Sequence, residues 1–145
     1  MNGCMAGGRR YLHVNNNGDV EPCVFCHFAV DNLRATTLTE ALKHPFFRAI
    51  REGIPYDGNL LRPCMLIDRP EVFREHARRH GARATHPGAE TLIGELADGL
   101  DRRAAAWARI AEEAWCSGRA LPMYPYPPGE EPGFVRPAPA VRRAG

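Results

Sequence analysis

The sequence predicts an α+β fold, in which a β-hairpin near the beginning of the chain is followed by several helices. Residues 10–14 alternate polar or aromatic side chains with aliphatic ones, which is the period-two pattern of a half-buried strand. After residue 37, apolar side chains recur at helical spacing behind residue types that favour helix starts. The 145 residues are 44% hydrophobic and 25% charged, a composition typical of one soluble globular domain.

The predicted hairpin joins residues 10–14 to a return strand that begins at Val20. The turn, residues 15–19, contains an Asn-Gly pair, and these residue types tolerate the positive φ that tight hairpins require. Pro22 ends the return strand because proline has no N–H to donate to a neighbouring strand. Cys23 follows directly after this end.

Three helices are predicted between residues 37 and 81, and each has its own start signal. Two begin at a capping box and one begins at a proline: Thr37 with Glu40, Asp68 with Glu71, and Pro45. Gly53 and Gly81 suit the positions just beyond the ends of the second and third helices. In the third helix, we expect Val72, Phe73 and Ala77 to face inward.

The rest of the chain is predicted to form a linker, one helix and a tail. Residues 82–118 are predicted as a short linker and one helix over 89–115, whose first half is weakened by Gly94 and Gly99. Residues 119–145 contain seven prolines and few bulky apolar side chains, so we expect them to be disordered or extended. The predicted organisation is therefore a domain, a linker with one helix, and a tail: 1–81, 82–118 and 119–145.

Charge and hydropathy exclude several classes of protein. The 19 basic and 17 acidic residues give a net charge of +2, which is too balanced to predict a nucleic-acid or anionic-membrane partner. No apolar run approaches the roughly 20 residues of a membrane span. The first eight residues lack the apolar region of a secretory signal, so we expect a cytoplasmic protein.

The cysteines are the strongest functional signal in the sequence. Cys4, Cys23, Cys26 and Cys64 have the spacing C-x18-C-x2-C-x37-C, and in a reducing compartment clustered thiols more often bind metal than form disulfides. The hairpin folds the chain back, so that Cys4 can approach Cys23. Four thiolates suit either a structural zinc ion or a [4Fe–4S] cluster, and spacing alone does not separate the two. Cys116, at a helix end, is read as a free thiol.

Other interpretations of these residues stay open. Reduced buried thiols without metal would also give clustered cysteines. A redox dithiol at Cys23 and Cys26 would prefer a thioredoxin-like βαβ unit, which this sequence does not supply. His27 follows Cys26 and could replace a missing ligand. The same string is typical of c-type haem attachment, but an expected cytoplasmic location and the other candidate thiols argue against haem. His76 and His80 are spaced to share a metal on one helix face, but no third ligand is evident.

A family resemblance is carried by the first 26 residues and by the segment around Cys64. The strings are Gly-Cys at 3–4, Gly-Gly-Arg-Arg-Tyr-Leu-His-Val at 7–14, Asn-Gly-Asp-Val-Glu-Pro-Cys-Val-Phe-Cys at 17–26 and Leu-Leu-Arg-Pro-Cys at 60–64. Together they resemble the auxiliary-cluster region of radical SAM proteins, of the SPASM/twitch kind, over residues 3 to about 80. In that family a hairpin with a G-D-V-x-P-C return strand is followed by a helix.

The resemblance implies an auxiliary [4Fe–4S] cluster held by Cys4, Cys23, Cys26 and Cys64, with a structural or electron-transfer role. It also implies a partner, a separately encoded radical SAM catalytic domain. The chain has no C-x3-C-x2-C spacing, which the family needs for S-adenosylmethionine, so we expect no catalytic residues and no catalysis by the chain alone. A detached C-terminal piece of such an enzyme is the resulting hypothesis, and a structural zinc module for protein interaction is the alternative.

Overall fold

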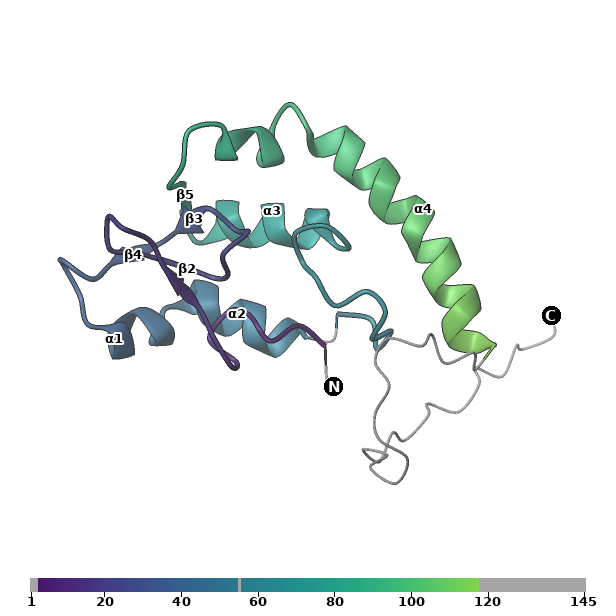
Figure 1. Cartoon of the computed structure of the whole chain (residues 1–145), viewed down its shortest axis with the longest axis horizontal. Coiled ribbons are helices and arrows are strands. Elements are labelled where there is room, and N and C mark those ends of the chain that lie inside the picture. Colours follow the sequence, from purple (N-terminus) through teal and green to yellow (C-terminus); the bar gives the residue numbers. More distant parts are fainter. Residues whose placement is uncertain (1–2, 55, 118–145) are drawn as a thin grey trace, which may run out of the picture.

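The computed structural model describes residues 3–54 and 56–117, and it has the predicted α+β architecture (Figure 1). Ten short elements follow one another along the chain: β1 His13–Val14, β2 Asp19–Glu21, β3 Phe28–Ala29, β4 Asp31–Asn32, α1 Leu38–Lys43, α2 Pro45–Gly53, α3 Pro70–Arg79, β5 Arg83–Ala84, the 3₁₀ helix η1 Ala89–Ile93, and α4 Ala97–Cys116. The strands form two sheets, one with the order β1-β2-β4 and one that pairs β3 with β5. No helix among the described residues is long and apolar enough to cross a membrane.

The predicted hairpin is present as the antiparallel pair of β1 and β2, with His13 opposite Glu21. Its turn is closed by the Gly18 N–H, which donates to the Asn15 carbonyl at 2.9 Å, and Gly18 has a φ of 87°. The first strand is shorter than residues 10–14 because the chain before His13 bonds elsewhere. The N–H of Arg10 donates to the carbonyl of Met5 at 3.0 Å, within the N-terminal loop.

Three strands were not predicted from the sequence. β4 pairs with the free edge of β2, placing Asn32 opposite Asp19, and β5 pairs with β3, placing Ala84 opposite Phe28. Each has only two residues, which is too short for a period-two pattern to be visible. Residues just after 82, expected as a linker, therefore include a strand that packs on the beginning of the chain.

The first two helices begin as predicted. At α1, the N–H of Glu40 donates to Thr37 Oγ1 at 3.2 Å, as in a capping box. The Glu40 carboxylate, however, accepts a hydrogen bond from Lys43 Nζ at 2.9 Å. Helix α2 begins at Pro45 and includes Gly53 as its last residue, one residue further than expected.

The capping box predicted at Asp68 and Glu71 is wrong. Helix α3 begins at Pro70 without a side-chain cap, and Arg69 occupies the cap position. Asp68 instead accepts a hydrogen bond from the N–H of Cys64 at 3.0 Å, so its carboxylate closes a loop rather than starting a helix. After α3, Gly81 has a φ of 65°, in agreement with its predicted role.

The helix predicted over 89–115 is divided into η1 and α4. The break lies at Gly94, with φ −124° and ψ −104°, outside the helical region. Glycine loses more conformational entropy on helix formation than other residues, which accounts for a break at this point. The tail predicted at 119–145 lies outside the described residues.

The core lies between the strands and helices α2 and α3 (Figure 1). Phe28 of β3 meets Phe73 of α3 edge-to-face, with ring centroids 5.0 Å apart. Phe46, Phe47 and Ile50 of α2 are also fully buried. Because α2 and α3 both pack on this core, they fix the ends of the loop between them, which carries Cys64.

Candidate metal centre

Cys4, Cys23, Cys26 and Cys64 line one cavity of about 20 Å³. They come from three separate segments: the N-terminal loop, the turn after β2, and the loop between α2 and α3. All four are free thiols, and Cys26 is fully buried. The structure thus brings together the four cysteines singled out in the sequence, whereas Cys116 is exposed at the end of α4.

The rest of the cavity wall is almost entirely apolar. It is formed by Ala6, Pro22, Ile50, Ile54, Tyr56, Met65 and Leu66. Such a wall excludes water, and a low dielectric strengthens electrostatic interactions between thiolates and a cation.

Cys4 is held in place by the tight N-terminal loop. The N–H of Ala6 donates to Cys4 Sγ at 3.4 Å, and Arg9 donates to the Cys4 carbonyl at 2.6 Å. The N–H of Gly7 donates to the carbonyl of Pro22 at 2.9 Å, which ties this loop to the end of β2. Gly7 has a φ of 67°, and a Cβ there would lie 2.4 Å from Ile50 Cγ2, so only glycine allows this approach.

Cys23 and Cys26 form a tight turn whose backbone faces the sulfurs. The N–H of Cys26 donates to the carbonyl of Cys23 at 3.0 Å. The backbone N–H groups of Phe25 and Cys26 act to lower the pKa of the Cys23 thiol, and that of Phe28 acts to lower the pKa of the Cys26 thiol, in each case against the larger effect of burial. Donors of this kind stabilise thiolate charge and tune the electronics of a bound metal centre.

Cys64 lies in a closed loop. Its N–H donates to Asp68 Oδ2 at 3.0 Å, and its carbonyl accepts from the N–H of Asp68 at 2.9 Å. The backbone N–H groups of Leu66 and Ile67 act to lower the pKa of its thiol, against the larger effect of burial. The sulfur therefore has the same kind of N–H environment as the sulfurs of the turn after β2.

The cavity makes thiolates unfavourable unless a cation is present. Burial raises the pKa of the Cys23 and Cys64 thiols, and raises that of Cys26 well above its ordinary range. Neighbouring thiols add to each shift, as do Glu21 for Cys23 and Cys26 and Asp68 for Cys64. A metal centre reverses this cost, because ligating thiols bind as thiolates. Four thiols, an apolar wall and N–H donors to sulfur fit a thiolate-ligated metal centre.

The four cysteines line one cavity, but their side chains are not arranged to hold a single metal ion. Within residues 3–54 and 56–117, no three or more His, Cys, Asp or Glu side chains are so placed that they could hold a metal ion.

The histidines considered in the sequence lie away from this cavity. His27 Nδ1 is 3.7 Å from Glu21 Oε2, and its ring lies 5.4 Å from that of His86. The rings of His76 and His80 are 6.3 Å apart, and His44 joins them from α2, 6.4 Å from His80. His44 Nδ1 already accepts the N–H of Phe46 at 3.1 Å, which makes it the N-cap of α2.

A buried polar network beside the centre was missed by sequence reasoning. Glu21, fully buried directly before Pro22 and Cys23, accepts hydrogen bonds from Asn15 Nδ2 at 3.2 Å and from Thr85 Oγ1, and lies 2.7 Å from His13 Nδ1. All three residues of β2 are buried, since β1 and β4 flank this strand. The half-buried pattern was predicted only for residues 10–14, and the return strand is too short for a period-two pattern to reveal the network.

The second carboxylate of this network, Asp19, is paired with a cation. Arg83 of β5 donates to Asp19, and with the amides of Asn32 and Asn15 it lowers the pKa of Asp19 to about 2, against the effect of burial. Asp19 therefore stays ionised and links the two sheets.

Comparison with protein families matches residues 4–65 to SPASM, an iron-sulfur cluster-binding domain. The match begins at Cys4 and ends one residue after Cys64, so it contains all four cysteines of the cavity. The match confirms the SPASM part of the predicted resemblance, over residues 4–65. Comparisons with curated proteins and with solved structures gave no match.

Proposed function

We propose that this chain binds a [4Fe–4S] cluster through Cys4, Cys23, Cys26 and Cys64. One observation carries the proposal: the four cysteines of the SPASM domain, from three separate segments, line the same apolar cavity. The N–H donors to these sulfurs support it further, because hydrogen bonds to sulfur adjust the potential of such centres. Four thiolates leave no iron open to a substrate, so the proposed role is structural or electron transfer.

We also propose that the domain acts with a radical SAM catalytic domain on another chain. The sequence contains no C-x3-C-x2-C spacing, and catalysis would have to come from the partner. Exposed apolar side chains on the segments that carry Cys4, Cys23 and Cys26 support a protein contact beside the cavity. Phe25 is 75% exposed, and Met5, Tyr11 and Val24 are also exposed.

The first test is metal analysis of the full chain purified without oxygen. Iron, acid-labile sulfide and zinc per chain should be measured on one sample, together with its visible spectrum. We expect about four irons and four sulfides, the content of one [4Fe–4S] cluster. One zinc without sulfide would replace the proposal with the structural zinc module, and a folded chain without metal would refute both.

A further inference from the structure

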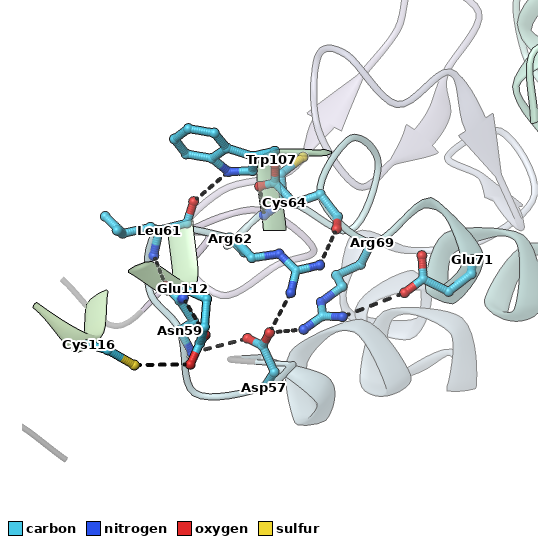
Figure 2. Close-up of polar contacts among 11 residues, drawn as sticks. Asp57, Asn59, Leu61, Arg62, Cys64, Arg69, Glu71, Trp107, Glu112 and Cys116 are labelled. Atoms are coloured by element: carbon cyan, nitrogen blue, oxygen red, sulfur yellow. Dashed lines mark hydrogen bonds and ion pairs between the residues drawn. The ribbon is translucent and has the colours of Figure 1, made fainter. Parts of the chain in front are cut away.

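Helix α4 lies beyond the SPASM domain in sequence but contacts the loop that carries Cys64 (Figure 2). Trp107 Nε1 donates to the carbonyl of Leu61 at 3.1 Å. Arg103 donates to the carbonyl of Ile67 at 3.1 Å. These two bonds hold the loop on both sides of Cys64, three residues before it and three residues after it.

The face of α4 that carries Trp107 also carries two small side chains, which allow the helix to lie close to the Cys64 loop. Ala104 and Ala111 are buried, and their small side chains bring the helix backbone near the loop. Further along, Glu112 accepts a hydrogen bond from the buried Asn59 at 3.2 Å (Figure 2). Asn59 in turn accepts the N–H of Leu61 at 3.0 Å, so a second connection from α4 reaches the residue that Trp107 contacts.

The contacts between α4 and the loop also affect where the Cys64 sulfur lies. The backbone of Ile67 acts to lower the pKa of the Cys64 thiol, and the carbonyl of Ile67 accepts the hydrogen bond from Arg103. Next to it, Asp68 binds the Cys64 N–H. The Arg62 guanidinium donates one hydrogen bond to the Asp68 carbonyl at 3.2 Å and another to the Asp57 carboxylate at 2.9 Å. A shift of the loop would therefore move both the sulfur and its N–H donors.

We propose that α4 is a positioning element of the metal centre, in which Trp107 and Arg103 hold Cys64 at the cavity. The inference rests on the proposed function. It adds that the metal centre depends on residues outside the matched segment 4–65. Cys64 is the one proposed ligand on this loop, whereas the other three lie on segments that bond to each other. Loosening the loop should therefore weaken a single ligand.

The test uses Trp107→Phe and Arg103→Met in the full chain. Phenylalanine keeps most of the aromatic surface but removes the N–H donor, and methionine keeps the side-chain length but removes the guanidinium. Trp115→Phe and Arg102→Met are matched controls on the same helix. For each variant, we would measure the rate of iron release to a chelator, the reduction potential, and the alkylation rate of Cys64 relative to Cys4 in metal-free chain.

We expect iron release to be about two- to tenfold faster in each test variant, the range of one hydrogen bond. The reduction potential should shift, and Cys64 alkylation should accelerate while that of Cys4 does not. The control variants should match the unaltered chain. Equal release rates, potentials and Cys64 reactivity in test and control variants would overturn the proposal.

A second outcome separates this inference from the proposed function. If the unaltered chain binds no cluster, the proposed function fails, and the ratio of Cys64 to Cys4 alkylation then decides the positioning inference. A raised ratio in the test variants supports it, and an unchanged ratio refutes it.

Discussion

At the scale of single residues, the centre depends on side chains that each have one specific task. Cys26 is fully buried, Gly7 permits a close backbone approach, and Asp68 closes the Cys64 loop. None of these tasks tolerates a larger or differently charged side chain. One substitution tests the proposed ligand set, and another tests the close approach of the backbone at Gly7.

Cys23→Ala should abolish cluster retention and lower the soluble yield, because it removes a proposed ligand and leaves three thiols around the cavity. Iron per chain after anaerobic purification is the measurement. Cys116→Ser, at the exposed end of α4, is the control and should leave the iron content unaltered. Unchanged iron in Cys23→Ala would remove this residue from the ligand set.

Gly7→Ala should destabilise the chain more than Gly58→Ala. Both glycines have positive φ, but a Cβ meets Ile50 only at residue 7, and nothing lies within 4 Å at residue 58. The difference in unfolding free energy therefore isolates the steric clash, which we expect to cost about 1–3 kcal/mol. Denaturant titration of both variants measures it, and equal losses would contradict the structure of the N-terminal loop.

At the scale of elements, short strands and helices are fixed by what packs on them. β5 joins the fold through Arg83 and Thr85, which reach the two buried carboxylates of β2. Helix α3 places Phe73 in the core, and further along the same face His76 and the C-cap residue His80 lie near His44. Nδ1 of His76 is buried without a hydrogen-bond partner in the described structure.

The histidines of α3 should make stability fall as the solution is acidified. Burial lowers the pKa values of His76 and His80 below the ordinary 6.5, with Arg79 contributing to both. The unfolded chain then binds more protons than the folded chain just below pH 6.5, so stability is lost as the pH falls through this window. Each histidine contributes a slope of at most about 1.4 kcal/mol per pH unit.

The double variant His76→Gln with His80→Gln should lose part of this dependence. Denaturant titrations between about pH 8 and pH 5.5 would show a shallower decline than for the unaltered chain. An identical slope would mean that these histidines titrate alike in both states.

At the scale of the whole molecule, the centre lies where three segments distant in sequence meet. α2 and α3 pack on the strands, and α4 extends along the side of the loop between them (Figure 1). Small domains have marginal hydrophobic cores, so a metal bound by the three segments would contribute to folding itself.

Metal removal should therefore lower the melting temperature of the chain. A chelator under reducing conditions is expected to shift the thermal transition, followed by circular dichroism, to lower temperature. Restoring iron and sulfide should restore the original transition. A melting curve unaffected by complete metal removal would show that the apolar core suffices alone.

Sequence patterns predicted the hairpin, the starts of α1 and α2, the end of α3 and the four cysteines. These features have local causes: an Asn-Gly turn, a capping threonine, a proline at the helix start and a glycine at positive φ. The capping box at Asp68 failed because the same carboxylate had a competing partner, the N–H of Cys64. The two-residue strands β3, β4 and β5 have no local signal.

The sequence by itself determined the fold class, the hairpin and the identity of the cysteines, because each follows from neighbouring residues. The tertiary structure decided which segments meet. β5 pairs with β3, Thr85 donates a hydrogen bond to Glu21, and Trp107 of α4 donates one to the loop before Cys64. These contacts join residues more than 40 positions apart. They depend on the packing of the whole core, which no local pattern encodes.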